Sequence, residues 1–75
     1  MHLSDLSKGQ HAVIRSVAGA NEEKGRLMDL GLIPGATIQL VRHISLSQSL
    51  QVDVKRARLV VRKGLAKLID VQVVS

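Results

Sequence analysis

Basic side chains are the groups in this sequence best placed to bind a ligand by charge. The chain has 11 Lys and Arg residues against six Asp and Glu residues, and its formal net charge is +5 at pH 7. A stretch without any acid holds six of these cations: Lys55, Arg56, Arg58, Arg62, Lys63 and Lys67. Such a stretch is either a solvated face or a surface for an anionic partner, whether an acidic protein or phospholipid headgroups.

Nucleic acid would also match this charge, but the composition argues against it. Small domains that bind single strands usually stack bases on aromatic side chains, and the chain contains no Phe, Tyr or Trp. No recognition-helix motif is present, and the one expected helix starts with Glu22 and Glu23. We therefore expect no nucleic-acid partner.

The residue types needed for covalent or metal chemistry are sparse and scattered. The absence of Cys excludes disulfides, thiolate ligands and a Cys nucleophile. His2, His11 and His43 share no spacing typical of a metal site, although His11 or His43 could meet Asp53 across neighbouring strands. There is no Gly-x-Ser-x-Gly or Walker A motif and no nucleophile next to a base. The sequence therefore predicts no enzyme, no cofactor and no metal site.

A short helix is expected after Asn21, which we predict to be its N-cap. The glutamates that follow suit the positive end of the helix dipole. Leu27 and Leu30 are expected to form the buried stripe, with Met28 at its edge. Gly31 stands where a left-handed residue ends a helix.

A Pro34-Gly35 pair follows the helix and has the chemistry of a type II turn. Backbone geometry and core packing explain most of this corner, whose structural residues we take to be Leu27, Leu30, Gly31, Leu32, Pro34 and Gly35. The corner can also leave part of its surface to a partner. The contact residues predicted there are Arg26, Met28, Asp29 and Ile33.

Alternating apolar residues predict the strands that hold this corner in place. Strands are expected over residues 11–18, 37–44, 50–55, 58–62 and 68–74. Their predicted inward residues include Ile38, Leu40 and Ile44, then Leu50, Val52 and Val54, then Leu59 and Val61, and finally Ile69, Val71 and Val73. Residues 55–58 are read as a tight basic turn, and Leu3 and Leu6 as plugs at a core edge. We predict one domain over residues 1–75, a mainly β fold that forms a small closed five-stranded barrel with one short α-helix.

The helix and corner resemble the bacterial ferrous iron transport protein A family (FeoA). The matching pattern is Arg26-Leu27, Leu30-Gly31-Leu32 and Pro34-Gly35 before an alternating strand, and later Leu59, Arg62, Ala66, Ile69 and Val71. Leu3, Leu6, Gly9 and Ile14 also fit. The departures lie in turns: Ser47-Gln48-Ser49 replaces a usual Gly-Asp-Pro, Arg56-Ala57 a common Gly, and Leu65 a usual Glu.

This resemblance implies an SH3-like barrel, similar to the C-terminal domain of metal-dependent transcription regulators. It also implies a cytoplasmic accessory that binds and modulates the membrane ferrous iron transporter, ferrous iron transport protein B. The transporter's G-protein-like domain or its membrane-facing part is the expected partner, and peripheral contact with the membrane surface fits the basic residues. Arg56 and Arg58 form a second candidate contact, where one of them could act as an arginine finger.

An alternative stays open at this point: a regulatory domain of the transcription-regulator type, binding a metal or a peptide segment. The location expected is cytoplasmic. The first ten residues lack the apolar region of a signal peptide, and no apolar run approaches the roughly 20 residues of a membrane span.

Overall fold

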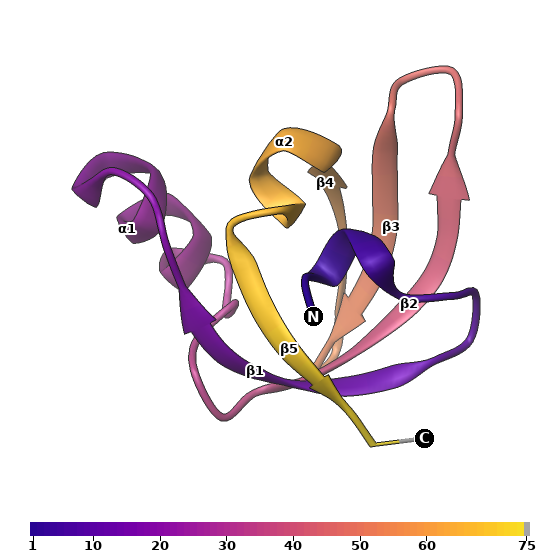
Figure 1. The fold of residues 1–75 in the computed structure, drawn as a ribbon, viewed down its shortest axis with the longest axis horizontal. Helices are drawn as coiled ribbons and strands as arrows, with labels where there is room; N and C mark the ends of the chain where they lie inside the picture. The colour runs from indigo at the N-terminus through magenta and orange to yellow at the C-terminus, as the bar shows by residue number, and fades with distance from the viewer. Residues whose placement is uncertain (75) are drawn as a thin grey trace.

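The computed structural model describes residues 1–74, which form five antiparallel strands and three short helical segments (Figure 1). The elements are η1 (Leu3–Asp5), β1 (His11–Val17), α1 (Asn21–Asp29), β2 (Thr37–Ile44), β3 (Ser49–Val54), β4 (Ala57–Arg62), α2 (Lys63–Ala66) and β5 (Ile69–Val73). All five predicted strands are confirmed, because an alternating pattern with short turns leaves little freedom in where a strand begins. None of these helices is long and apolar enough to span a bilayer.

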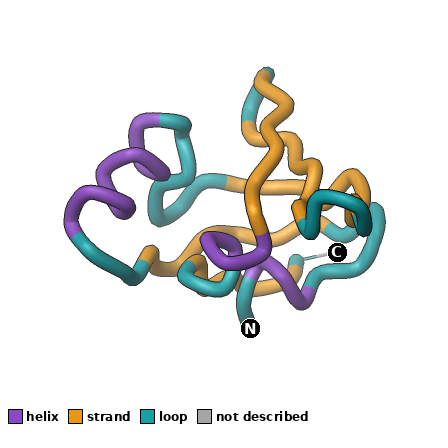
Figure 2. The backbone as a smooth tube through the Cα atoms, turned by 90° about the horizontal axis from the view of Figure 1, so that it is seen from above, coloured by secondary structure: helices purple, strands orange, loops and turns teal. Residues whose placement is uncertain are grey.

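The sheet curls into a barrel whose strand order is β4-β3-β2-β1-β5 (Figure 2). The predicted closure by strand pairing is wrong, since β4 and β5 are the outer strands of this order and are joined through α2. The free side of β5 is covered by the N-terminus instead: Val71 donates its N–H to the carbonyl of Met1 at 2.7 Å, and His2 forms an isolated bridge with Asp70. Covering an edge with another segment is one of the ways in which proteins block strand addition.

The core is entirely aliphatic, as the composition requires. Leu3 and Leu6 are both buried, so the first turn plugs the barrel as predicted. From Leu50 onward strand β3 alternates as predicted, with Leu50, Val52 and Val54 buried. Burial of this kind contributes about 25 cal/mol per Å² of apolar surface and stabilises the domain.

A β-bulge in β2 changes which side chains face inward. The pairing with β3 shifts between Leu40 and Arg42, so that Val41 is the extra residue. Beyond it His43 pairs with the buried Leu50, and its Nε2 lies 2.8 Å from the carbonyl oxygen of Leu6. The inserted residue places His43 on the same face as Leu50. His43 nevertheless stays exposed and Ile44 is half-buried, so the predicted order of burial of these two side chains holds.

Helix α1 begins one residue earlier than predicted and ends as predicted. Ala20, rather than Asn21, is the N-cap, and no side chain caps the helix. At the other end Gly31, with φ +95°, donates its N–H to Met28, while Leu32 donates to Leu27 at 3.1 Å. These two bonds define a Schellman motif, which fixes the direction in which the chain leaves the helix.

The type II turn at Pro34-Gly35 is also present. Gly35 has φ +92°, and Ala36 donates its N–H to the carbonyl of Ile33 at 3.0 Å. The turn is tied to β1 by two further bonds, from Gly35 to Ile14 at 2.7 Å and from Ile14 to Ala36 at 2.9 Å. The corner is thus anchored to the sheet through its backbone.

Candidate docking groove

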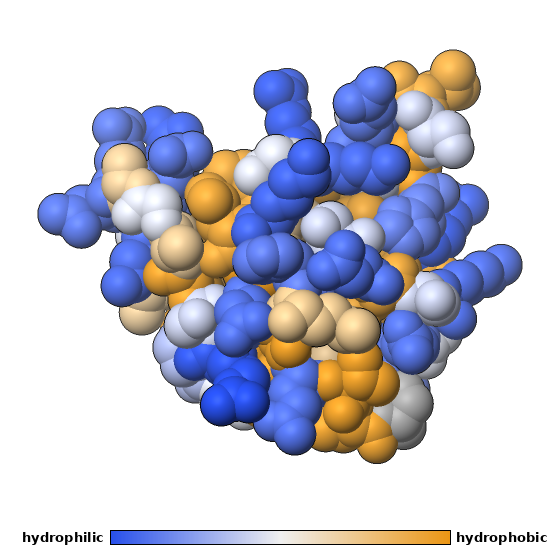
Figure 3. Space-filling model, viewed as in Figure 1, coloured by the Kyte–Doolittle hydropathy of each residue, from blue (hydrophilic) through white to orange (hydrophobic). Residues whose placement is uncertain are grey.

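A groove of about 610 Å³ lies between α1 and α2. Its lining comes from both helices and the end of β4: Glu23, Arg26, Leu27, Leu30, Arg62, Gly64 and Leu65. Figure 3 shows hydrophobic side chains reaching the surface between the two helices. Its lining is more apolar than that of the hollows beside His11, Asp70 and Arg56.

The floor of the groove contains a leucine that sequence reasoning placed in the core. Leu27 is 2% exposed, whereas Leu30 is 51% exposed, so its predicted burial is wrong. The reason is that α1 stands at the side of the barrel and Leu30 is the C-cap, where the chain already turns away (Figure 1). Helical periodicity indicates which side chains share a face but not how far the opposing sheet extends.

Leu65 forms the other side of the floor. It lies on the single turn of α2, which is closed by the bond from Lys67 N–H to the Lys63 carbonyl at 3.1 Å. Its side chain is half-buried and packs against the core. Leu30 and Leu65 therefore form a fixed apolar surface that water covers in the free protein.

Two arginines at the rim differ in their partners. Arg26 donates to Glu22 one turn earlier at 3.1 Å, and both side chains are exposed, so the pair contributes only about 0.3–0.5 kcal/mol. Arg62 has no ion-pair or hydrogen-bond partner for its side chain within residues 1–74. A ligand carboxylate at that side of the groove could bind the Arg62 guanidinium without displacing another side chain from it.

The predicted contact residues of the helix lie mostly outside the groove. Arg26 lines it, but Met28, Asp29 and Ile33 do not. Met28 and Asp29 are exposed, and Ile33 is half-buried against the core. Leu65 and Arg62 were missed because their position depends on how α2 sits beside α1, which no local pattern encodes.

The basic stretch is divided between the two ends of β4. Lys55 and Arg56 form the turn before the strand, whereas Arg62 is its last residue and Lys63 comes directly after it. Six strand residues span roughly 20 Å, so residues 55–63 do not form one surface. Lys55 takes a positive φ of 56°, which makes the turn tighter than the predicted 55–58.

Arg58 belongs to strand β4 rather than to the hairpin tip on which it was placed. Its Nε donates to Asp53 Oδ1 at 2.8 Å and its terminal nitrogen to Oδ2 at 3.2 Å. These hydrogen bonds hold the pKa of Asp53 below its ordinary value and raise the pKa of Arg58. Arg58 is therefore already occupied, whereas Arg56 stays exposed on the turn.

A second hollow, polar and about 440 Å³, lies on the outer face of the sheet. His11 and Asp53 both line it, because His11 pairs with Gln39 and Gln39 pairs with Asp53 across adjacent strands. His43 is elsewhere, beside Leu6. Within the described residues no group of three or more His, Cys, Asp or Glu side chains is arranged to hold a metal ion.

A curled five-stranded sheet with a helix inserted between its first two strands, and with an apolar groove rather than a cluster of reactive groups, is a mainly β barrel of the SH3-like class. Domains of this kind carry their function in surface grooves and loops. The chain belongs to the FeoA domain family, whose family model matches residues 1–73. The resemblance seen in the sequence is thereby confirmed.

Solved structures support the same assignment. FeoA from Chlorobium tepidum is 35% identical, with a TM-score of 0.91 over 100% of this chain and 71% of that one. FeoA from Stenotrophomonas maltophilia, complexed with zinc, is 32% identical, with a TM-score of 0.82 over 96% and 89% of the two chains. That protein is described as a prokaryotic SH3 domain protein and a candidate ferrous iron transport activating factor.

The likeness to transcription regulators is one of fold alone. A manganese-dependent transcriptional repressor complexed with manganese superposes with a TM-score of 0.90, at 12% identity. This chain covers 36% of that protein. The similarity confirms that the same barrel occurs within metal-dependent regulators, and it carries no statement about what this chain binds.

Proposed function

We propose that this chain is a non-catalytic, cytoplasmic accessory of ferrous iron uptake that binds and modulates the membrane ferrous iron transporter, ferrous iron transport protein B. The observation that carries the proposal is the preformed groove between α1 and α2 in a domain of the FeoA family. The transporter's cytosolic G domain or membrane-facing part supplies a segment that fills it.

The chemistry of the groove specifies what that segment contains. An apolar side chain seated between Leu30 and Leu65 removes apolar surface from water, and covering the open half of one leucine contributes about 1 kcal/mol. A carboxylate beside it accepts a charge-assisted hydrogen bond from the unpaired Arg62. We expect a short segment with an apolar anchor and a neighbouring acidic residue.

The absence of catalysis is part of the same proposal. The displaced pKa values of Asp53 and Arg58 arise from their ion pair with each other on an open sheet face. Structural ion pairs perturb pKa values without marking an active site. The groove itself presents leucines, two arginines and one glutamate, which suit binding rather than proton transfer.

The test is an affinity measurement with the purified transporter in nanodiscs, repeated with its soluble G domain. We expect Leu30→Ser and Leu65→Ser each to weaken binding about fivefold to tenfold, because central apolar contacts dominate interface energies. Arg62→Gln should weaken binding mainly at low salt. Val60→Ser is the matched control, since Val60 is 62% exposed on β4 outside the groove.

Modulation is read from iron uptake into proteoliposomes containing the transporter. The wild-type chain should change the uptake rate, and Leu30→Ser at the same concentration should not. A folded wild-type chain that binds neither form of the transporter would contradict the proposal. If Leu30→Ser and Val60→Ser bound the transporter with equal affinity, the contact would lie outside the groove.

A further inference from the structure

Charge is distributed unevenly between the two halves of this protein. Residues 37–69, from the start of β2 to the start of β5, hold seven of the 11 basic residues but only one of the six acids. That acid is Asp53, which is paired with Arg58. The remaining residues are close to neutral, so nearly all of the positive potential arises from β2, β3, β4 and α2.

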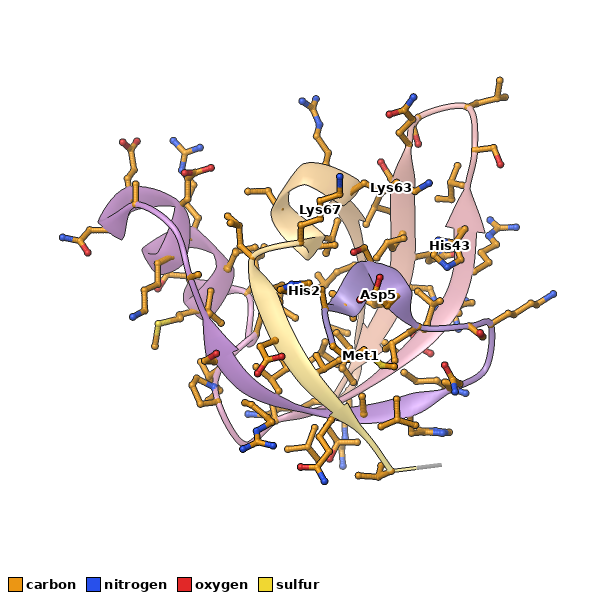
Figure 4. All side chains as sticks on the ribbon, viewed as in Figure 1. Met1, His2, Asp5, His43, Lys63 and Lys67 are labelled. Carbon is orange, nitrogen blue, oxygen red and sulfur yellow. The ribbon has the colours of Figure 1, made fainter. Side chains whose placement is uncertain are left out.

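One end of this half combines cations with a projecting turn. The β2–β3 turn, residues 45–48, and the first residue of α2 are joined by the bond from Lys63 N–H to the Gln48 carbonyl at 2.9 Å. Lys67 lies one helical turn after Lys63, and Arg62 comes directly before Lys63. Figure 4 shows Lys63 at the start of α2 and Lys67 just after its end. We call this set (Leu46, Arg62, Lys63 and Lys67) the basic tip.

The cations of the basic tip have no acidic partners among residues 1–74. No ion pair involves Arg62, Lys63 or Lys67. Asp5 on η1, labelled below these lysines in Figure 4, forms no ion pair with them, and its carboxylate accepts the N–H of His2 at 3.0 Å. The positive charge at this end is thus left for an external anion.

Leu46 gives the basic tip an apolar point. It is fully exposed at the end of a hairpin that extends past the rest of the barrel (Figures 1 and 3). The turn is held rigidly, with Gln48 at φ 49° and its N–H donating to Ser45 at 3.2 Å. The turn that carries Leu46 is therefore tied through its backbone to the start of α2.

We propose that the basic tip is a contact surface for anionic phospholipid membranes, with Leu46 entering the interface and the three cations lying at headgroup level. A convex apolar point with long cationic side chains nearby suits a deformable anionic surface, whereas an acidic protein would need a concave site to receive Leu46. Snorkelling Lys and Arg stems favour the same boundary. The proposal does not depend on transporter docking, because it concerns this chain and lipid alone.

The expected binding is weak and reversible. Each basic residue near an anionic leaflet strengthens binding about fivefold, and a partly inserted leucine adds a similar factor. Such affinity does not anchor the chain by itself, since stable anchoring takes two strong signals. It orients a protein whose proposed partner already lies in the membrane.

The first experiment is sedimentation with vesicles of equal phosphatidylcholine and phosphatidylglycerol, compared with phosphatidylcholine alone, at 0.1 M salt. We expect binding to the anionic vesicles only. The double variant Lys63→Gln, Lys67→Gln should bind about 25-fold more weakly. The matched control is Lys55→Gln, Arg56→Gln, which removes the same charge at the other end of β4, beyond the ~10 Å screening length.

The second experiment uses the absence of aromatic residues. The variant Leu46→Trp carries the chain's sole indole, so its fluorescence has no background. We expect a blue shift on adding anionic vesicles, and none for Val60→Trp on the outside of β4. Far-UV circular dichroism confirms that each variant folds; all substituted residues are exposed.

Three results would overturn the proposal. One is no binding of the wild-type chain to the anionic vesicles. Another is an equal loss for the two double variants, which would mean that net charge alone acts. The last is an unshifted indole spectrum in Leu46→Trp together with tighter binding to polyglutamate than to vesicles, which would assign the basic tip to an acidic protein.

Discussion

The corner after α1 and the β2–β3 turn are both connections in the chain, but they are stabilised in opposite ways. In the corner, Leu27 and Leu32 are buried, and Gly31 and Gly35 supply the positive φ angles. The turn buries nothing at its end, and Leu46 is fully exposed there. The corner thus serves the fold, and the turn is free to serve contact. Leu30, at the edge of the corner, is half exposed and therefore resembles Leu46 of the turn more than the buried leucines of the corner.

The largest expected effect separates two leucines that lie two residues apart. Leu32→Ala removes a fully buried side chain and should cost about 2–5 kcal/mol of unfolding free energy. Leu30→Ala should cost less than about 1 kcal/mol, since half of the side chain is already in water. Urea unfolding followed by circular dichroism measures both. Equal losses would mean that Leu30 is part of the core after all.

A smaller effect separates two glycines of the same segment. Gly31→Ala should destabilise the domain by about 1–2 kcal/mol, because alanine is strained at φ +95° even though its Cβ would meet Val54 at an ordinary 3.7 Å. Gly25→Ala lies inside α1 with open space around it and should stabilise by up to about 1 kcal/mol. Thermal unfolding of the two variants, measured side by side, gives the sign of each change. If Gly25→Ala destabilised the domain, the space around Gly25 on α1 would not be open in solution.

These features differ in how far sequence alone predicts them. The helix end at Gly31 and the turn at Pro34-Gly35 were predictable, because few residue types adopt the backbone conformations that these positions require. The strands were predictable from alternation, but the bulge at Val41 was not, since valine suits both a regular and a bulged strand. The groove was missed because Leu30 and Leu65 come to line one hollow only through the places that α1 and α2 take on the barrel, which depend on the whole chain.

The pair Asp53–Arg58 predicts a small pH dependence of stability. The pKa of Asp53 is lowered in the folded state, so its stabilising contribution is present above its unfolded pKa and is lost as pH falls through the folded value. Asp53→Asn should lower the unfolding free energy slightly at pH 7 and leave it nearly unchanged below the folded pKa, so that stability falls less steeply on acidification. Asp29→Asn, on the exposed end of α1, is the control. Identical acid limbs for wild type and Asp53→Asn would show that the pair does not form in solution.

The smallest expected effect concerns the exposed turn. Leu46→Ser should leave the unfolding free energy unchanged within about 0.5 kcal/mol, because surface substitutions away from special features rarely exceed that. The same urea titration measures it. A loss as large as that of Leu32→Ala would place Leu46 in a packed contact and remove the contrast between the two connections.

The most direct test of the groove is a titration of the isotope-labelled chain with the transporter's soluble G domain, followed by backbone amide chemical shifts. If the groove is the docking site, the shifts should concentrate at Leu30, Arg62, Gly64 and Leu65 and disappear in Leu30→Ser. Shifts confined to Lys55 and Arg56, or none near α2 despite binding, would contradict the account.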